Sequence, residues 1–587
     1  MSQEKLGANG SIKRTENRQK VVAEGDFLES LLADLLEKVL RGVLRISDEA
    51  LKQVQSCLLE EPKEKSFGDI SSPCALKLAS FLKRPPRQIA QEMVSSLNAE
   101  ISGGELKNLI EKIDIAGAGF INFYLSKEYF YSHLKEIHNS KDFFSFPEKG
   151  SQNLLIEFVS ANPTGPLSVA HGRQAAVGDV LASILQFLGY KVTREYYLND
   201  EGNQINILGK SIALRLKELQ GEKIDFPEDH YQGDYIIDLA KELLEAQQRQ
   251  NTGRGRPCAC PITSEDCREH GVRRILEIIR KELEDFGVRF DSWYSQAVLQ
   301  KSGKIERVIA DLREKGFVYD QEGAVWFSST KFGDDKDRVI IKSDGSYTYL
   351  APDIAYHQDK FNRGFNRLIN LWGPDHHGYI PRMKAAVRAL GKDASSLNVI
   401  IVQLASLFRE GKAVSMSTRK GEYVTLRQVL DEVGSDAARF FFLMRRTDSH
   451  LDFDLELAKK QSAQNPVYYV QYSYARICSI LANSNAGLET VKEADLSLLK
   501  EMEEIALLKV LHGFKQSLRI VEVQLDPYNL TVYLQELAES FHRFYDKHRV
   551  LVEDVKLRDA RLSLILGCKE VLASGFRLLG IKAPEKM

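Results

Sequence analysis

The chain has no run of eighteen apolar residues, and its first twenty residues, MSQEKLGANGSIKRTENRQK, hold no apolar core. We therefore expect neither a membrane-spanning helix nor a signal peptide, because both need a continuous apolar stretch. Seven cysteines in 587 residues are too few for a disulfide framework, so a reducing cytoplasm is the predicted compartment. The polar, basic N-terminal arm predicts a flexible tail over residues 1–25.

Net charge is also small, at -2 at pH 7. This value neither supports nor excludes a nucleic-acid partner, because a polyanion contacts a local basic surface and not the average of the chain. At 43% hydrophobic residues, 587 residues are too many for one compact core and predict several domains.

Three patterns follow one another along the chain. Residues 26–145 combine helical periodicity, as in FLESLLADLLEKVLRGVL, with a strand-like run in INFYLSKEYF, and predict an α+β module. Over residues 150–430, apolar strands such as NLLIEFV and RLINLWG alternate with helices, which predicts an α/β domain with a parallel sheet. Residues 431–587 are helical in almost every window and predict an all-α bundle.

The stretch EFVSANPTGPLSVAHGRQAAVGDVL (157–181) holds the first candidate site. Apolar residues recur at helical spacing from Val177 to Leu188, and Gly189 follows as a C-terminal cap, so His171 lies near a helix start. Free backbone N–H groups at such a start bind phosphate, and a histidine there can donate a hydrogen bond to a phosphate oxygen. A polar cap of the helix is the alternative interpretation of His171.

The same stretch resembles the nucleotide-binding signature of class I aminoacyl-tRNA synthetases, and SANPTGPL followed by HGR is similar to the arginyl family. The similarity continues, in the family's order, through REYYLNDEGNQI (194–205), FGVRFDSWYSQ (286–296), residues 334–365, LINLWGPDHHGY (368–379), VSMSTRKGEYVTL (414–426), NPVYYVQYSYARI (465–477) and FHRFYDKHRVL (541–551). The resemblance implies a Rossmann-type catalytic domain over 150–430 with an insertion around 210–290. It also implies that residues 26–145 bind tRNA and that residues 431–587 bind the anticodon.

The reaction implied by this resemblance is arginine--tRNA ligation in protein synthesis. L-Arginine and ATP, which carries Mg²⁺, form arginyl-adenylate and release pyrophosphate. Arginine is then esterified to the 3′ end of tRNA(Arg), with activation expected only when tRNA is bound. We expect a cytoplasmic monomer with no membrane partner and no tightly bound cofactor.

The resemblance implies an arginine site made by Glu157, Asn162, Gln204, Tyr349 and Asp353. Asp353 matches the family's guanidinium reader, and a carboxylate is the complementary acceptor for that planar, forked donor. Tyr349 bounds the pocket, Glu157 and Asn162 lie against the guanidinium and α-amino ends, and Gln204 borders it. As an alternative, Asp353 is an acid that favours the positive end of its own helix.

The implied ATP site lies over the helix start. It comprises Pro163, Ala170, His171 and Gly172 of the first signature, the loop residues Gly373, Asp375, His376 and His377, and Met416, Ser417, Arg419 and Lys420 of the second signature. The expected catalytic residues are His171, Ser168 and Arg419. Adjacent histidines 376 and 377 could indicate a metal, but no third ligand follows at a suitable spacing, so we predict none.

Both signatures depart from the family pattern. The usual His-Val-Gly-His is Ser168-Val-Ala170-His171 here, which loses one histidine and the glycine against which adenine packs. The lysine-rich second signature reads SMSTRK (415–420). The cations available there are Arg409, Lys412, Arg419 and Lys420. Arg419 matches a basic family position, and a solvated basic loop is the alternative.

In the helical region, we expect tRNA contacts from Tyr468, Arg476, Tyr545 and Arg549, which lie in segments that mix aromatic and basic residues. Such an aromatic stripe is also typical of a helical core. The fragment KLASFLKRPPRQIA supplies a basic patch in the N-terminal module.

A cluster outside the resemblance contains Cys258, Cys260, Cys267 and His270. These residues could surround Zn²⁺, but the spacing is not a common zinc pattern, and we predict reduced surface cysteines.

Two other functions fit parts of the pattern. A non-catalytic tRNA-binding paralogue would explain the weakened signatures, but the retention of Glu157, Asn162, Tyr349, Asp353 and His171 argues against it. The long helical C-terminal region argues against a small-molecule nucleotidyltransferase with the same core.

Overall fold

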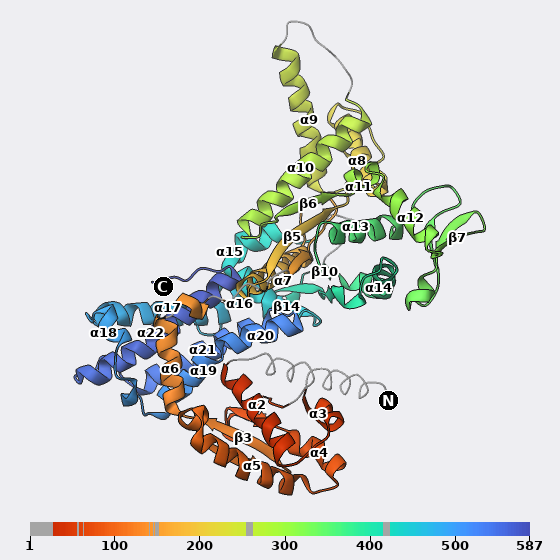
Figure 1. Ribbon diagram of the computed structural model, residues 1–587. Helices are drawn as coiled ribbons and strands as arrows, with labels where there is room; N and C mark the ends of the chain where they lie inside the picture. The colour runs from red at the N-terminus through yellow and green to blue at the C-terminus, as the bar shows by residue number, and fades with distance from the viewer. Residues whose placement is uncertain are drawn as a thin grey trace. The chain divides into compact units, whose positions relative to one another are not determined.

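A computed structural model describes residues 27–55, 58–60, 62, 64–139, 141–144, 146, 149, 152–253, 262–414 and 423–587 (Figure 1). The chain divides into two compact units. Unit 1 comprises Met1–Phe146, Tyr469–Arg577 and Ala583–Met587, and unit 2 comprises Pro147–Tyr468 and Leu578–Lys582. None of the helices in the described ranges has the length and hydrophobicity needed to cross a membrane. The tail predicted over residues 1–25 lies outside the described residues.

Unit 2 is built on a five-stranded parallel sheet with the order β11-β10-β4-β5-β6. The strands are β4 (Asn153–Glu157), β5 (Lys191–Leu198), β6 (Ser292–Ser295), β10 (Arg367–Trp372) and β11 (Leu397–Ile401). This sheet confirms the predicted α/β fold. The chain runs from β4 to β5 on one side, whereas β10 lies on the other, so the strand order reverses between β4 and β10. Ligands of open parallel sheets bind at the carboxyl ends of the strands at such a reversal.

The sheet is covered by helices that share its apolar core. Leu154, Leu155 and Ile156 of β4 are fully buried, as expected for a strand with both faces covered. The covering helices include α7 (Val169–Phe187), α11 (Gln296–Lys301), α12 (Lys304–Glu314), α13 (Leu350–Asn362) and α14 (Ile380–Ala389). Gly178 allows α7 to pack closely, because a Cβ atom there would lie 2.3 Å from Cγ of Phe158.

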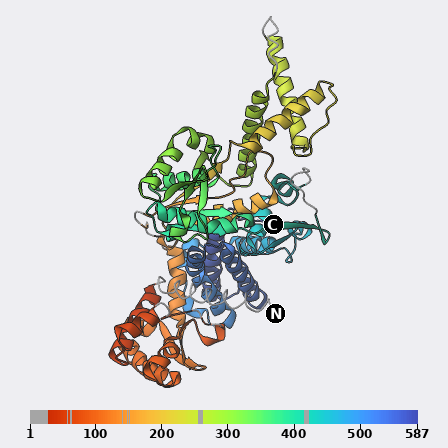
Figure 2. The same cartoon turned by 90° about the vertical axis from the view of Figure 1, so that its right-hand side faces the viewer.

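Three helices lie between β5 and β6, where the resemblance implies an insertion around 210–290: α8 (Asn203–Leu219), α9 (Asp234–Gly253) and α10 (Ser264–Asp285). They stand together as a group in both views (Figures 1 and 2). Unit 2 also holds an antiparallel sheet of β7 (Val318–Gln321), β8 (Ala324–Phe327) and β9 (Arg338–Ile341). A third sheet contains β12 (Ala405–Arg409), β13 (Lys412–Ala413) and β14 (Leu451–Asp454), followed by α16 (Leu455–Lys459), and α15 (Leu426–Leu443) packs on α7.

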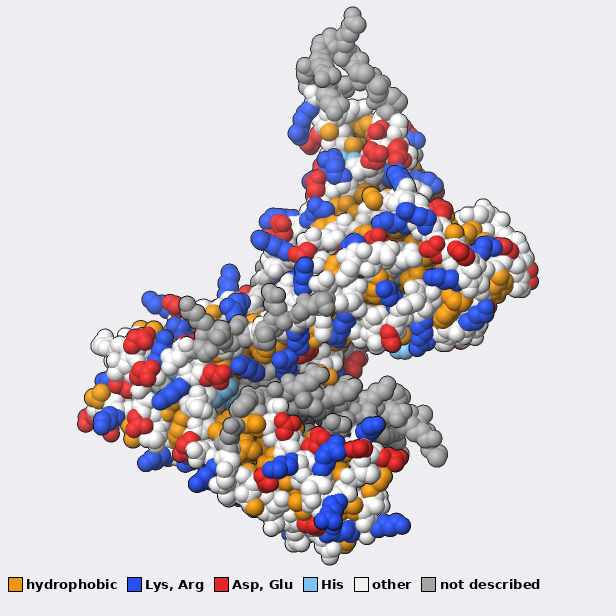
Figure 3. All heavy atoms as spheres, in the orientation of Figure 1, with side chains coloured by type: hydrophobic (Ala, Val, Ile, Leu, Met, Phe, Trp, Pro, Cys, Tyr) orange, Lys and Arg blue, Asp and Glu red, His pale blue; other side chains and the backbone are white. Residues whose placement is uncertain are grey.

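Unit 1 joins an α+β module to a helical bundle. The module has an antiparallel sheet of β1 (Ile70–Ser72), β3 (Phe120–Leu125) and β2 (Ile110–Ala116) with α2 (Phe27–Gly42), α3 (Asp48–Gln55), α4 (Cys74–Leu82), α5 (Pro86–Gly103) and α6 (Lys127–Asn139). The bundle contains α17 (Pro466–Asn483), which begins in unit 2, and α18 (Leu488–Lys492), α19 (Met502–His512), α20 (Phe514–Gln524), α21 (Tyr528–Lys547) and α22 (Val555–Leu579), which ends in unit 2. Both predicted classes, α+β and all-α, are confirmed. On the face seen in Figure 3, acidic and basic side chains are interspersed, in keeping with the small net charge.

Candidate active site

The chain leaves β4 through a turn that few side chains favour. Val159 and Ser160 have φ angles of 67° and 42°, in the left-handed region that a β-branched residue rarely adopts. Ser160 Oγ donates to Oε1 of Glu157 at 3.2 Å and accepts the backbone N–H of Tyr197 at 3.1 Å. Such strain is typical of ligand sites, where the surrounding structure compensates for it.

Glu157, the last residue of β4, forms a buried ion pair. Its Oε2 atom accepts from Nζ of Lys360 at 2.6 Å, and Lys360 is fully buried. Lys360 also donates to Oδ1 of Asn370 at 3.2 Å, and Nδ2 of Asn370 lies 3.0 Å from Nε2 of His357. Burial and the nearby Lys360 charge lower the pKa of His357 to about 3, so the ring is neutral. Sequence reasoning missed Lys360, because a lysine in a helix is usually exposed.

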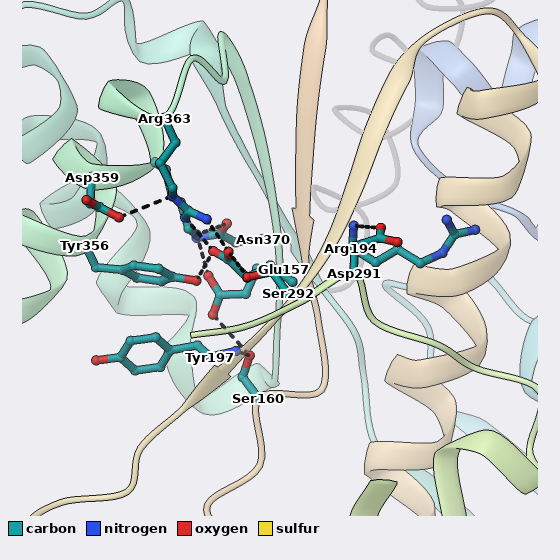
Figure 4. A network of polar contacts seen from close by, with 12 residues as sticks. Glu157, Ser160, Arg194, Tyr197, Asp291, Ser292, Tyr356, Asp359, Arg363 and Asn370 are labelled. Carbon is teal, nitrogen blue, oxygen red and sulfur yellow. Dashed lines mark hydrogen bonds and ion pairs between the residues drawn. The ribbon is translucent and has the colours of Figure 1, made fainter. Parts of the chain in front are cut away.

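A second buried carboxylate, Glu195 on β5, fastens α13 to the sheet. It accepts from both terminal nitrogens of Arg363 at 2.5 and 2.8 Å, from the Tyr356 hydroxyl at 2.7 Å and from Oγ of Ser292 at 2.9 Å (Figure 4). Burial opposes its ionisation, but the bonds from Arg363 and Tyr356 and the Lys360 charge keep its pKa below the ordinary value. These contacts make Glu195 a structural residue.

Asp353 lies in the first turn of α13. Its Oδ2 atom accepts from the Tyr379 hydroxyl at 2.6 Å. Burial raises the pKa of Asp353 to about 6, with the Tyr379 bond opposing the rise and the charge of Glu157 adding to it. A carboxylate with this pKa is mostly ionised at neutral pH and is therefore suited to a cationic ligand.

The other predicted arginine-site residues are placed as follows. Nδ2 of Asn162 donates to Oε1 of Gln204 at 2.6 Å, so the structure brings this pair together. Tyr349 precedes α13 and is 78% exposed, so its ring stands out from the protein. Tyr197 was not predicted, yet its ring packs on Tyr356 at a centroid distance of 4.5 Å. Burial raises the pKa of Tyr197, and the charges of Asp353 and Glu157 add to the rise.

His171 lies in the first turn of α7, as predicted. The backbone N–H of Ser168 donates to Nδ1 of His171 at 3.1 Å, and Oγ of Ser168 lies 3.1 Å from the same nitrogen. Burial lowers the pKa of His171 to about 4. The neutral ring therefore carries its proton on Nε2. The two interpretations of His171 are compatible, because one nitrogen caps the helix while the other remains a donor.

The loop before His171 is held by two tyrosines that sequence reasoning missed. The Tyr235 hydroxyl donates to the Thr164 carbonyl at 2.8 Å, and the Tyr423 hydroxyl donates to the Pro166 carbonyl at 2.9 Å. A Cβ atom at Gly165 would lie 3.1 and 3.3 Å from these two hydroxyl oxygens, so the glycine permits their approach.

The remaining predicted ATP residues differ in environment. Pro163 and Gly172 are buried, and a Cβ atom on Gly172 would lie 2.7 Å from Cδ1 of Leu426, which indicates a packing role for this glycine. Ala170 and Gly373 are partly buried. Asp375, His376 and His377 are exposed and lie in the short helix Pro374–Tyr379, between β10 and α14.

The second signature lies outside the described residues, including Met416, Ser417, Arg419 and Lys420. Arg409 is paired with Glu432 at 2.6 Å, and Lys412 is exposed.

The zinc hypothesis stays untested. Cys258 and Cys260 lie outside the described residues. Cys267 is buried in α10, so the prediction of surface cysteines is wrong for this residue, and Nε2 of His270 is 3.4 Å from Glu242. Among the described residues, no group of three or more histidine, cysteine or acidic side chains is arranged for a metal.

Some of the predicted tRNA residues form a stack in unit 1. The Arg476 guanidinium lies 4.9 Å from the centroid of the Tyr545 ring, which stacks on the fully buried Phe541. Arg549 is exposed, and Tyr468 lies on the part of α17 that belongs to unit 2. Phe541 is therefore a core residue, and Arg476 and Tyr545 form the accessible layer above it.

Family profiles match three segments of the chain. The profile described as the class I (R) tRNA synthetase catalytic domain matches residues 133–477, the arginyl tRNA synthetase N terminal domain matches 27–125, and the DALR anticodon binding domain matches 470–587. The chain belongs to the arginyl-tRNA synthetase family. The arginine--tRNA ligase of Desulfosudis oleivorans is 48% identical over 535 residues, which cover 90% of this chain and 94% of that protein.

Two further proteins support membership of the arginyl-tRNA synthetase family. The arginine--tRNA ligase of Syntrophotalea carbinolica is 47% identical over 90% of this chain and 94% of its own length. A solved structure assigned as an arginyl-tRNA synthetase, from Campylobacter jejuni, matches with a TM-score of 0.72 and 37% identity, covering 79% of this chain and 100% of that one. These matches confirm the resemblance and the class I assignment.

Proposed function

We propose how the described residues carry out the reaction of the arginyl-tRNA synthetase family. The chain is an arginine--tRNA ligase that uses L-arginine, ATP and tRNA(Arg) as substrates. The roles of individual side chains, MgATP as the form of the nucleotide, and the order of binding belong to the proposal.

Asp353 is the acceptor for the substrate guanidinium. Glu157 and Lys360 form a buried pair whose charges cancel, so Asp353 gives the pocket one net negative charge. A single positive guanidinium matches that charge, and its forked donors match the carboxylate geometry. The observation that carries the proposal is that Asp353 is bonded by a neutral tyrosine hydroxyl, whereas Glu157 is neutralised by a lysine.

Asn162 and Gln204 bind the polar α-amino end of arginine, which the exposed ring of Tyr349 covers from the other side. The support is that the two amides already contact each other at the end of β4 and the start of α8. Tyr349 begins the helix that carries Asp353, so both residues belong to one side of the pocket.

His171 donates its Nε2 proton to a phosphate oxygen of MgATP. The arginine carboxylate attacks the α-phosphorus, pyrophosphate leaves, and negative charge grows on the phosphate oxygens during the step. A fixed neutral donor at a helix N-terminus stabilises that charge without reorganising. Ser168 sets the tautomer, since its N–H donates to Nδ1. The adenosine lies near residues 373–377, and Arg419 supplies a cation for the outer phosphates.

The larger organisation follows the family. We propose a tRNA-binding module over 26–145, a catalytic domain over 150–430 and an anticodon-binding domain over 431–587, with Tyr468, Arg476, Tyr545 and Arg549 as tRNA contacts. We also propose that the protein activates arginine only when tRNA is bound, that it is a monomer and that it is cytoplasmic.

Aminoacylation of total tRNA tests this function. The purified chain is incubated with MgATP, labelled arginine and total tRNA, and label in the tRNA fraction is the expected result. Intact tRNA binding without label would favour the non-catalytic paralogue. Transfer of AMP to another small molecule in the absence of tRNA would favour the nucleotidyltransferase.

A further inference from the structure

Tyr379 joins the two substrate sites of unit 2. It is the last residue of the short helix Pro374–Tyr379, which follows β10 and contains the residues expected near adenosine. Its ring lies 5.9 Å from that of Trp372, at the end of β10. Its hydroxyl, in contrast, donates to Asp353 at 2.6 Å on α13.

Several charged and titratable groups face this contact. Lys360 and His357 come from the same helix as Asp353, and Nδ1 of His357 lies 2.8 Å from the Asp353 carbonyl oxygen. The charge of Glu157 on β4 raises the pKa of Asp353 and that of Lys360 lowers it, while the charge of Asp353 raises the pKa of Tyr197 on β5. The guanidinium of Arg382 lies 5.6 Å from the centre of the Tyr379 ring. Burial and the Asp353 charge raise the pKa of Tyr379, so its hydroxyl keeps its proton at neutral pH and remains a donor.

We infer that Tyr379 is a positioning residue for arginine recognition. Its hydrogen bond holds Oδ2 of Asp353 and leaves Oδ1 as the acceptor for the guanidinium. The same bond favours the ionised carboxylate, because a donor stabilises the charged form of its acceptor. The inference rests on the proposed function, in which Asp353 binds the guanidinium.

Tyr379→Phe tests the inference, because it keeps the ring and removes only the donor. We expect the KM for arginine to rise about tenfold, the scale of one hydrogen bond to a charged group, with little change in kcat or in the KM for ATP. The acidic limb of the kcat/KM profile for arginine should move to higher pH, since loss of the donor raises the pKa of Asp353. A side chain that only filled space would not move this profile.

The matched control is Tyr319→Phe, which removes the bond from the Tyr319 hydroxyl to Asp337 (3.0 Å) on the small antiparallel sheet. It should leave both KM values and the pH profile as in the wild type. Thermal melts with and without arginine show whether each variant is folded and still binds the amino acid.

The outcomes separate the inference from the proposed function. If Asp353→Asn leaves the KM for arginine unchanged, the assignment of Asp353 fails and the inference fails with it. If Asp353→Asn raises that KM strongly while Tyr379→Phe changes neither the KM nor the pH profile, Asp353 binds arginine but Tyr379 does not position it.

Discussion

At the scale of single residues, the site is defined by which ionisable groups keep their charge. His171 and His357 are neutral because burial lowers the pKa of each, to about 4 and about 3. Burial raises the pKa of Asp353 to about 6, so its carboxylate is mostly ionised at neutral pH and loses its charge as the pH falls below that value. The proposed chemistry therefore needs one ionised carboxylate and one neutral imidazole.

The pKa of Asp353 determines how kcat/KM for arginine should depend on pH. Its carboxylate must be ionised to bind a guanidinium, and its raised pKa means that it is protonated as pH falls through about 6. We expect kcat/KM for arginine to decline below that pH, approaching tenfold per unit. Steady-state kinetics between pH 5 and 8 check this, with the KM for ATP as the internal control. A flat profile for arginine would contradict the assignment.

The buried carboxyl of Glu282 should make the stability of unit 2 depend on pH. This residue of α10 is 5% exposed, and burial raises its pKa to about 7, against an opposing bond from the Leu167 backbone. Below pH 4.5, near the pKa of the unfolded state, Glu282 is protonated in both states and does not reduce the free energy of unfolding. As the pH rises from 4.5 to 7, the unfolded state loses this proton first, so the free energy of unfolding falls. The loss is on the order of 3 kcal/mol.

Glu282→Gln should remove this dependence. Because the three tryptophans, at positions 293, 326 and 372, all lie in unit 2, their fluorescence reports the urea unfolding of this unit. The variant should gain stability relative to the wild type at pH 8 but not at pH 4.5. Glu284→Gln, on an exposed position of the same helix, is the control. An equal effect of Glu282→Gln at both pH values would refute the prediction.

At the scale of elements, α13 is the centre of the site. Asp353, Tyr356, His357 and Lys360 recur at intervals of three, four and seven residues, so they share one face of this helix. From this face Tyr356, Lys360 and His357 contact Glu195 of β5, Glu157 of β4 and Asn370 of β10, and Asp353 accepts from Tyr379. The face is polar and yet buried, which explains why α13 needs the carboxylates of Glu157 and Glu195 opposite it.

Lys360→Met tests that pairing. The substitution leaves the Glu157 carboxylate buried without its cation, and we expect a loss of about 3–5 kcal/mol in the stability of unit 2. The double variant Lys360→Met with Glu157→Gln should recover much of this loss, because no uncompensated charge remains. Tryptophan-detected urea unfolding measures the cycle.

The exposed pair Arg313 and Asp320 is the comparison, and Arg313→Ala should cost less than about 1 kcal/mol. Strictly additive effects of the Lys360 and Glu157 substitutions would show that the two charges do not depend on each other.

The sequence predicted the elements far better than the contacts between them. The strand at 153–157 and the helix that follows it were predicted from local sequence patterns, because such patterns are enough to decide them. The ion pair of Glu157 could not be predicted from local patterns, because Lys360 is about 200 residues away and its burial depends on the assembled sheet. The hydrogen bonds from Tyr235 and Tyr423 to the loop before His171 were missed for the same reason. Candidate site residues were found where a motif carries them, as at His171 and Asp353.

At the scale of the whole molecule, the chain returns to unit 2 at its C-terminal end. Arg439 of α15 is fully buried and donates to the Leu579 carbonyl at 2.7 Å, to the Phe286 carbonyl at 3.1 Å and to Oδ2 of Asp179 at 2.5 Å. Residues 578–582 are therefore part of the same unit as the sheet, although the helix that precedes them belongs to unit 1.

Deletion of residues 578–587 should destabilise unit 2. It removes the Leu579 acceptor from a buried guanidinium, which costs about 2–3 kcal/mol. Deletion of residues 583–587 alone leaves that bond in place and serves as the control. Tryptophan-detected unfolding that is identical for both deletions would mean that the contact with Arg439 contributes nothing to stability.

The most direct test of the account is a crystal structure with a non-hydrolysable analogue of arginyl-adenylate. We predict that its guanidinium binds Oδ1 of Asp353 while its phosphate-mimicking group accepts from Nε2 of His171. A guanidinium placed away from Asp353, or a phosphate mimic away from the start of α7, would contradict the account.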